Sequence, residues 1–506
     1  MSAETKTLNK KIGQATRWSA VTEVCAKLVA PISSMILARL LTPEAFGVVA
    51  TFNVIISFTD MFTDAGFQKY LVQHEFSSDT DREESTTVAF WTNLIISLVL
   101  WGIIILFRHP LAAMVGNPDK GNVLAIACIV LPMTSFSSIQ MAVLKRDFDF
   151  RSLFFARIIG VCIPIFITVP SAFWLRSYWA LIIGTIARHI SDAVVLTIRS
   201  PWKPRIFYSV RKLREMISFS LWTLMEQIAI WLTSYIGTFI VGVYLTSHYV
   251  GLYKTAMATV TQFTTLITSA TTPVLFSALS RLQDEKQRFE ETFLHFQRMV
   301  SLLIVPMCLC IFMYRDLVTK ILLGEQWMEA SMFIGLWGLT SGLGILLNNY
   351  CSEAYRALGK PKISLAVQVL HLLFLVPALL LAAKEGFVPL YWTRSMIRFQ
   401  LYITQLIVLY VVTRISVLKI AKNIAPAILA GCAALVAAIA LQRAGSSILW
   451  DTVSIGICGV IYIGTLLLIP SVRKELFLLI VPKLPKKLTA KLPHHPKGGQ
   501  VFEKEW

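Results

Sequence analysis

The sequence is poor in charge, and its few cysteines are scattered. Of its 506 residues only 15% are charged, whereas 56% are aliphatic, aromatic or cysteine. A soluble chain of this length needs a more charged surface. The eight cysteines stand singly, most of them inside apolar runs, and their spacing fits neither a disulfide framework nor a zinc site. These shortages exclude an ordinary soluble domain and a cysteine-stabilised secreted one.

The motifs of several enzyme classes are also missing from the sequence. It contains no P-loop and no glycine-rich dinucleotide turn, and no hydrophilic stretch is long enough for a nucleotide-sugar fold. A self-contained ATP-driven pump therefore does not fit, and nothing resembles an enzyme site. We expect a protein that is not an enzyme and that holds neither a metal nor another cofactor, apart from a coupling H⁺ or Na⁺.

Long apolar runs are abundant, and many approach the roughly 20 residues that a helix needs to cross a bilayer. The sequence predicts an all-α polytopic membrane protein. We expect about fourteen transmembrane helices, near 17–39, 45–67, 86–107, 122–143, 151–173, 177–199, 216–244, 249–275, 295–314, 331–350, 362–383, 387–412, 423–441 and 449–470.

The net charge of +18 would suggest nucleic acid in a soluble chain, but here the basic residues flank apolar spans. They gather in alternate connections, with about 34 on one predicted side and about 8 on the other. This asymmetry predicts an even number of spans with both termini in the cytoplasm. We expect membrane lipids around the protein and no nucleic acid.

A short motif occurs twice in the chain. Residues 41–47 read LTPEAFG, and the frame returns as LTSHYVG at 245–251, an offset of about 204 residues. Six predicted spans separate the copies, so both enter the membrane in the same direction, as in a parallel repeat. We expect Thr42 and Thr246 to cap the following helices, and Gly47 and Gly251 to allow close helix packing.

The repeat divides the chain into two lobes, followed by two extra helices. The predicted boundaries are 1–198 for the N-lobe with spans 1–6, 199–215 for a basic cytoplasmic linker, 216–412 for the C-lobe with spans 7–12, 413–470 for spans 13 and 14, and 471–506 for a basic cytoplasmic tail. One connection, 315–330, has apolar residues at helical spacing and predicts an interfacial helix.

Ionisable residues inside the predicted spans mark candidate functional positions, because a charge at bilayer depth costs several kcal/mol unless it is paired or hydrated. Five cations could line a cavity between the lobes and attract phosphate or diphosphate: Lys27, Arg188, Lys254, Arg394 and Arg398. Five acids could carry a coupling ion or balance charge: Glu23, Asp60, Asp64, Asp192 and Glu226. A structural ion pair is the alternative for Arg188 with Asp192, and solvation is the alternative for Asp64. Lys254 lies near the outer end of its predicted span, so its alternative is a side chain that reaches the lipid headgroups.

Six segments in order resemble the Wzx-type polysaccharide flippases, including those like the colanic-acid exporter, of the multidrug/oligosaccharidyl-lipid/polysaccharide transporter superfamily, which also contains the MATE transporters. They are LARLLTPEAFG at 37–47, DAGFQKYLVQHE at 64–75, VLKRDFDF at 143–150, LFSALSRLQD at 275–284, LLGEQWMEA at 322–330 and ALGKPK at 357–362. His74 departs from the pattern, which has a basic Arg at this position.

The resemblance implies two six-helix lobes in a V, in the inner membrane of a bacterium, and alternating access. It implies a flippase that moves undecaprenyl-diphosphate-linked oligosaccharide from the cytoplasmic to the periplasmic leaflet for exopolysaccharide, capsule or lipopolysaccharide export. A polysaccharide polymerase and glycosyltransferases are expected partners. Two alternatives stay open: a cation-coupled drug or metabolite antiporter of the same superfamily, and a membrane scaffold or enzyme of glycan assembly without transport.

Overall fold

The computed structural model describes residues 29–64, 67–445, 447–470 and 472–473, and this part of the chain forms helices joined by turns, without a strand. Twelve of its helices are long and apolar enough to cross a membrane. Two shorter apolar helices, Val29–Leu40 and Trp231–Tyr244, coincide with the predicted spans 1 and 7. The protein is therefore a multi-pass α-helical membrane protein, as predicted, and the total of fourteen spans stays a prediction.

The helix bounds follow the predicted spans closely, and the segments at both ends lie outside the described residues. The first half contains α2 (Pro43–Asp64), α3 (Phe67–Gln73), α4 (Asp79–Leu106), α5 (Arg108–Met114), η1 (Pro118–Lys120), α6 (Gly121–Ala127), α7 (Val130–Arg146), α8 (Phe150–Ile163), η2 (Pro164–Thr168), α9 (Val169–Leu175) and α10 (Tyr178–Arg199).

The second half contains α11 (Val210–Tyr244), α12 (Ser247–Arg281), α13 (Lys286–Met313), α14 (Arg315–Leu322), η3 (Glu325–Ala330), α15 (Ser331–Gly344), η4 (Ile345–Asn349), α16 (Tyr350–Ala357), α17 (Pro361–Lys384), α18 (Phe387–Met396), α19 (Arg398–Thr413), α20 (Val417–Ala444) and α21 (Ile448–Leu468). Four predicted spans consist of several helical pieces. Two of these spans contain a π-helical turn, η2 and η4, and another breaks between α18 and α19.

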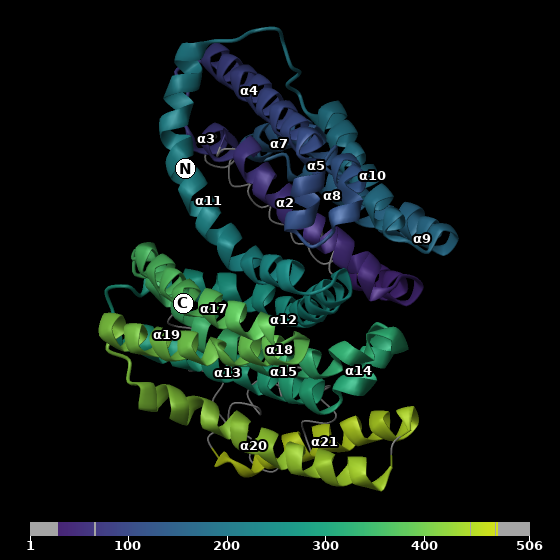
Figure 1. Cartoon of the computed structure of the whole chain (residues 1–506). Helices are drawn as coiled ribbons and strands as arrows, with labels where there is room; N and C mark the ends of the chain where they lie inside the picture. Colours follow the sequence, from purple (N-terminus) through teal and green to yellow (C-terminus); the bar gives the residue numbers. More distant parts are fainter. Residues whose placement is uncertain (1–28, 65–66, 446, 471, 474–506) are drawn as a thin grey trace, which may run out of the picture.

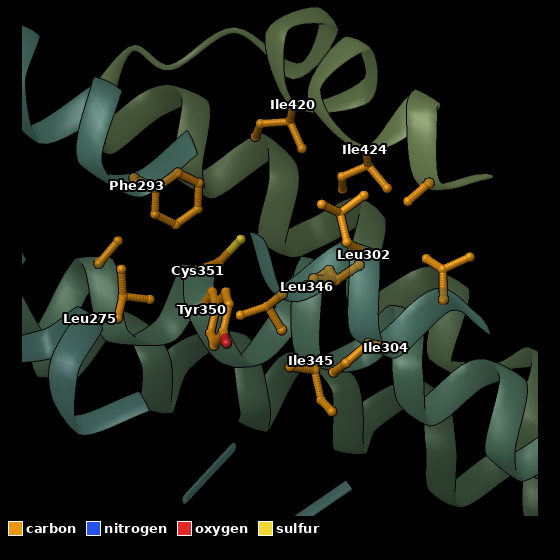
Figure 2. Close-up of a cluster of buried hydrophobic side chains, with 14 of the residues drawn as sticks. Leu275, Phe293, Leu302, Ile304, Ile345, Leu346, Tyr350, Cys351, Ile420 and Ile424 are labelled. Atoms are coloured by element: carbon orange, nitrogen blue, oxygen red, sulfur yellow. The ribbon is translucent and has the colours of Figure 1, made fainter. Parts of the chain in front are cut away.

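The helices gather into two bundles (Figure 1). Helices α2 to α10 form one bundle and α12 to α19 the other, while the long α11 runs from the first to the second. Helices α20 and α21 lie beside the second bundle, and α20 packs against α13. Figure 2 shows the buried cluster at this junction, in which Phe293 and Leu302 of α13 lie near Ile420 and Ile424 of α20. Hydrocarbon packing thus attaches the last two helices to the second bundle.

The connection from α10 to α11 is shorter than the predicted linker, because α11 already begins at Val210. Basic side chains of this connection and of the first turn of α11 pair with acidic residues in the first turns of α4. Arg205 Nη1 lies 2.7 Å from Glu83 Oε2, and Lys212 Nζ contacts Asp81 Oδ1. These ion pairs attach the start of α11 to the first bundle.

The two copies of the repeated motif pack directly against each other where α2 crosses α12. A Cβ atom built on Gly47 would lie 1.6 Å from the carbonyl oxygen of Ser247, and one built on Gly251 would lie 1.8 Å from that of Pro43. The contact is reciprocal, because Pro43 and Ser247 are themselves equivalent positions of the repeat. Only glycine allows this approach, so the predicted packing role of both glycines is confirmed.

The capping prediction for the two threonines is confirmed at one copy only. Thr42 Oγ1 accepts a hydrogen bond from the backbone N–H of Ala45, at 3.4 Å. Thr246 occupies the N-cap of α12, but its side chain makes no capping hydrogen bond there. The next side chain, that of Ser247, instead donates to Asn117 Oδ1 across the boundary between the bundles, at 2.7 Å. The second copy thus uses a hydroxyl to join the bundles.

We predict that Gly47→Ala destabilises the protein, because its methyl group would force α2 and α12 apart. Overpacking of this kind costs about 1–3 kcal/mol. Gly456→Ala is the matched control, since nothing lies within 4 Å of a Cβ at Gly456 and alanine favours a helix. The measurement is the thermal unfolding midpoint of each variant in detergent. Equal midpoints for the two variants would contradict the proposed crossing.

Candidate functional site

Three of the predicted cations lie together in the second bundle, around a break in a predicted span. Helix α18 ends at Met396 and α19 begins at Arg398, so Arg394 and Arg398 stand on opposite sides of the break. Lys254 lies in α12, close enough to Arg394 for the two positive charges to repel each other. Discontinuous helices are a common way to build substrate sites in transporters.

The two guanidinium groups share the indole ring of Trp337 in α15. Arg398 Cζ lies 4.2 Å from the ring centroid and Arg394 Cζ lies 5.0 Å from it. Each contact of this type is worth about 0.5–2 kcal/mol, which is less than the cost of an unpaired charge at bilayer depth. The aromatic ring therefore orients the arginines without neutralising them.

Hydrogen bonds from the arginines end on hydroxyl groups, not on carboxylates. Arg398 Nη1 donates to Ser341 Oγ at 2.7 Å, and Arg394 Nε donates to Tyr253 Oη at 3.0 Å. Most of the five N–H donors of each guanidinium have no acceptor within the described part of the chain. The side chains are thus held in place with donors left for a ligand.

Local backbone features make room for Arg398. A Cβ on Gly344 would lie 3.0 Å from Arg398 Nη2 and 2.9 Å from Tyr402 Oη. The π-helical turn η4 begins at the next residue, Ile345, and such turns often occur at functional sites. Tyr402 is fixed in turn by its hydroxyl, which donates to the carbonyl oxygen of Thr340 at 2.6 Å.

Lys254 extends the positive charge toward the first bundle. Its Nζ atom lies 4.8 Å from the centroid of the Tyr235 ring in α11. None of the acidic side chains that the structure describes forms an ion pair with Lys254, Arg394 or Arg398. We call these three residues the cation cluster. Like charges that lie together without a carboxylate favour an anionic ligand.

The other predicted residues are placed elsewhere or lie outside the description. Arg188 is not part of the cation cluster, because its Nε atom lies 3.9 Å from Asp192 Oδ2 on the next turn of α10. Both side chains pack beside Gly160 of α8. Asp60 accepts a hydrogen bond from Thr134 Oγ1 at 3.0 Å, which joins α2 to α7.

Four predicted residues cannot be placed. Glu23 and Lys27 precede the first described residue, and the side chains of Asp64 in α2 and Glu226 in α11 lie outside the described residues. Tyr253 and Trp337, the aromatic residues that contact the cation cluster, were absent from the sequence prediction. An aromatic residue in an apolar span is usually a packing residue, and only the position of Tyr253 next to Lys254 could have suggested a role.

A second feature joins the two bundles at the end where α2 and α12 begin. The predicted interfacial segment is helical, as α14 and η3, but its Trp327 is wholly buried between the bundles. Trp327 Nε1 donates to the carbonyl oxygen of Ala38 at 2.7 Å. Gln326 Nε2 donates to the carbonyl oxygens of Ala38 and Leu41, at 2.6 and 2.9 Å. We call these four residues the end contact.

The end contact satisfies backbone carbonyls that the C-terminus of helix Val29–Leu40 leaves without intrahelical partners. Arg39 adds a bond in the other direction, from its Nη2 atom to the carbonyl oxygen of Ile321, at 2.6 Å. A polar cavity of about 450 Å³ lies nearby, lined by residues that include Glu44, Asn117, Lys120 and His248. The bundles are therefore locked together at this end by polar bonds as well as by the glycine crossing.

Comparison with known proteins assigns the chain to a family. The model of a polysaccharide biosynthesis protein family matches residues 36–332, more than half of the sequence. The chain belongs to this family. The similarity to the two relatives described next spans about two thirds or more of each chain.

The chain is 25% identical to the succinoglycan biosynthesis transport protein ExoT of Rhizobium meliloti over 340 residues, which are 67% of either chain. It is 21% identical to the lipopolysaccharide biosynthesis protein WzxC of Escherichia coli over 388 residues, covering 74% of this chain and 76% of that protein.

Solved structures show the same fold. The lipid II flippase MurJ, in an inward closed conformation, superposes with a TM-score of 0.72 at 12% identity, covering 89% of this chain and 98% of MurJ. An inward-facing MATE transporter gives a TM-score of 0.56 at 14% identity, with coverage of 78% and 95%. The predicted fold class is therefore confirmed.

We predict that the end contact resists separation of the bundles. The double variant Gln326→Ala/Trp327→Phe removes three hydrogen bonds, each worth about 1 kcal/mol. A cysteine at the buried position Ser247, in a background without native cysteines, should then react with a maleimide about tenfold faster or more. The measurement is the labelling rate of the purified protein.

Gln442→Ala is the matched control for this double variant. Gln442 Nε2 also donates to a backbone carbonyl, that of Met313, but it joins α20 to α13 within the same half of the molecule. Its loss should leave the labelling rate unchanged. Equal rates for the double variant and the control would show that the end contact does not hold the bundles together.

Proposed function

We propose that this protein is a flippase for polyprenyl-diphosphate-linked oligosaccharides that are used in exopolysaccharide, capsule or lipopolysaccharide export. The cation cluster carries the proposal, because it places three positive charges without a described acidic partner at a broken helix in a MurJ-like fold. A diphosphate supplies the charge and the acceptors that this cluster lacks. ExoT is a succinoglycan biosynthesis transport protein and WzxC a lipopolysaccharide biosynthesis protein by name, and the similarity of this chain to both supports the same function.

The cycle follows from the contacts between the bundles. With both termini in the cytoplasm of a bacterial inner membrane, the glycine crossing and the end contact lie on the periplasmic side. The substrate then enters from the cytoplasmic leaflet, binds to the cation cluster, and leaves after the periplasmic contacts break and the opposite side closes. The polyprenyl tail stays in the bilayer throughout. The two lobes of this cycle comprise residues 1–198 and 216–412. Glycosyltransferases supply the substrate, and a polymerase consumes it.

Antiport of a lipophilic cation is the second candidate, since the fold also matches a MATE transporter. The chemistry of the cluster opposes it, because Lys254, Arg394 and Arg398 would repel a cation. Extrusion of such cations by reconstituted protein, without movement of lipid-linked glycan, would favour this second candidate.

The cation cluster is tested by the double variant Arg394→Gln/Arg398→Gln. Each charge-assisted hydrogen bond to a phosphate oxygen contributes about 1.5–3 kcal/mol, so affinity for undecaprenyl diphosphate should fall at least about tenfold. Surface polymer should fall in a host whose own copy of the gene is deleted. Native mass spectrometry measures the binding, and an immunoblot checks the amount of protein.

Arg414→Gln is the control for this double variant, because Arg414 lies at the far end of α19 and outside the cation cluster. It should bind undecaprenyl diphosphate and restore polymer as the unchanged protein does. Normal affinity and normal polymer in the double variant would remove the cluster from the mechanism.

Coupling to H⁺ or Na⁺ is a further part of the proposal, and Asp60 is the residue that we propose binds the coupling ion. Asp60→Asn should remove the acceleration that a pH or sodium gradient gives to transport in proteoliposomes, because the amide cannot exchange the ion. Binding of undecaprenyl diphosphate should persist, since Asp60 lies outside the cation cluster. Gradient-dependent transport by Asp60→Asn would assign coupling to another residue.

A further inference from the structure

A row of aromatic rings leads away from the cation cluster and crosses from the second bundle to the first. Lys254 lies over Tyr235, which is stacked nearly parallel to Trp231 on the next turn of α11, with ring centroids 5.8 Å apart. The row continues into α2, where the Phe58 ring centroid lies 4.9 Å from that of Trp231. Phe62 follows at 5.1 Å from Phe58.

The central ring of the row is held in a fixed orientation. Trp231 Nε1 donates a hydrogen bond to Ser57 Oγ of α2, at 3.0 Å. Residues 231 and 235 are four apart on one helix and therefore share a face. The rings are thus positioned by backbone geometry and by a polar bond between α11 and α2, which leaves little rotational freedom to lose on binding.

The row differs from the packing aromatics of this protein in its exposure. Phe58 is 41% exposed, and Trp231 and Tyr235 are only partly buried, whereas Phe52 on the same helix is 1% exposed and Trp327 is fully buried. Phe58 also contacts a ring from the other half of the molecule, so this part of α2 faces the junction of α2 with α11. Binding sites commonly combine aromatic side chains with a few charged groups, and the row provides such rings next to Lys254.

Sugars are the ligands that suit such a surface. The C–H bonds on one face of a pyranose carry a small positive charge, and the face of an aromatic ring is negative. A pyranose can therefore lie flat on the ring while its hydroxyl groups stay hydrated. A diphosphate-linked sugar presents an anion and a ring side by side, in the order in which Lys254 and the aromatic row are arranged.

We propose that Tyr235, Trp231 and Phe58 form a stacking platform for the sugars nearest the diphosphate. This inference rests on the proposed flippase function and adds a separate contact to it. The cation cluster binds the diphosphate, and the platform distinguishes a lipid that carries sugar from one that does not. Stacking depends on the apolar face of a pyranose and not on individual hydroxyl groups. The platform therefore accepts repeat units of differing sugar composition.

The experiment compares two probes, undecaprenyl diphosphate and undecaprenyl diphosphate glucose, by native mass spectrometry of the purified full-length protein. The unchanged protein should bind the glucose-bearing lipid about tenfold more tightly. Trp231→Leu and Phe58→Leu should each remove most of this preference and leave the affinity for the sugar-free lipid unchanged. Trp231→Phe, which keeps a ring but loses the bond to Ser57, should retain most of the preference.

Phe166→Leu is the matched control, because Phe166 is an exposed aromatic in η2, away from the row. It should bind both lipids as the unchanged protein does. A preference for the glucose-bearing lipid that survives in both leucine variants would overturn the platform. Equal affinity of the unchanged protein for the two lipids would overturn the platform but leave the flippase function intact. Failure of the unchanged protein to bind either lipid would overturn the proposed function itself.

Discussion

The close approach of α2 and α12 is the constraint on which the rest of the structure depends. Two glycines at equivalent positions allow backbone atoms of the two bundles to meet where side chains would otherwise keep them apart. Lys254 lies one helical turn beyond Gly251, so the crossing also sets the position of the cation cluster. The same crossing brings α2 beside α11 and thereby completes the aromatic row.

The candidate site combines fixed rings with charges that have no described acidic partner. Trp337 orients two arginines, and Tyr235 lies under a lysine, but aromatic rings do not cancel charge as carboxylates do. The protein thus keeps three cations in a low-dielectric region at a cost that a bound anion would offset. A site whose positive charges are balanced only by its ligand suits a transporter, because binding of the ligand changes the free energy of the conformation that holds it.

Much of the fold could be predicted from the sequence, because apolar length and the alternation of basic connections report directly on membrane spans. The repeat was also visible, and Gly47 and Gly251 have the packing role that was expected of them. The division of single spans into several helical pieces could not be predicted. The breaks at Ile397 and at η4 involve no proline, and the role of Trp327 depends on the carbonyl oxygen of Ala38, 289 residues away.

The candidate site was predicted only in part. Charges inside apolar spans identified Lys254, Arg394 and Arg398, because the cost of burying a charge is a property of the residue itself. Their grouping, and the separate pairing of Arg188 with Asp192, depend on which helix faces come together. Aromatic partners such as Tyr253 and Trp337 carry no comparable signal, since most aromatic residues in membrane helices only pack.

The reciprocal glycine contact has the form of an interface between two identical subunits. Gly47 meets the carbonyl of Ser247 as Gly251 meets that of Pro43, so each position contacts its own equivalent region across an approximate two-fold axis. A six-helix ancestor with this turn could make the same contact with a second copy of itself. Fusion of the two genes would preserve the interface and free each half to diverge, as Lys254 has diverged from Ala50.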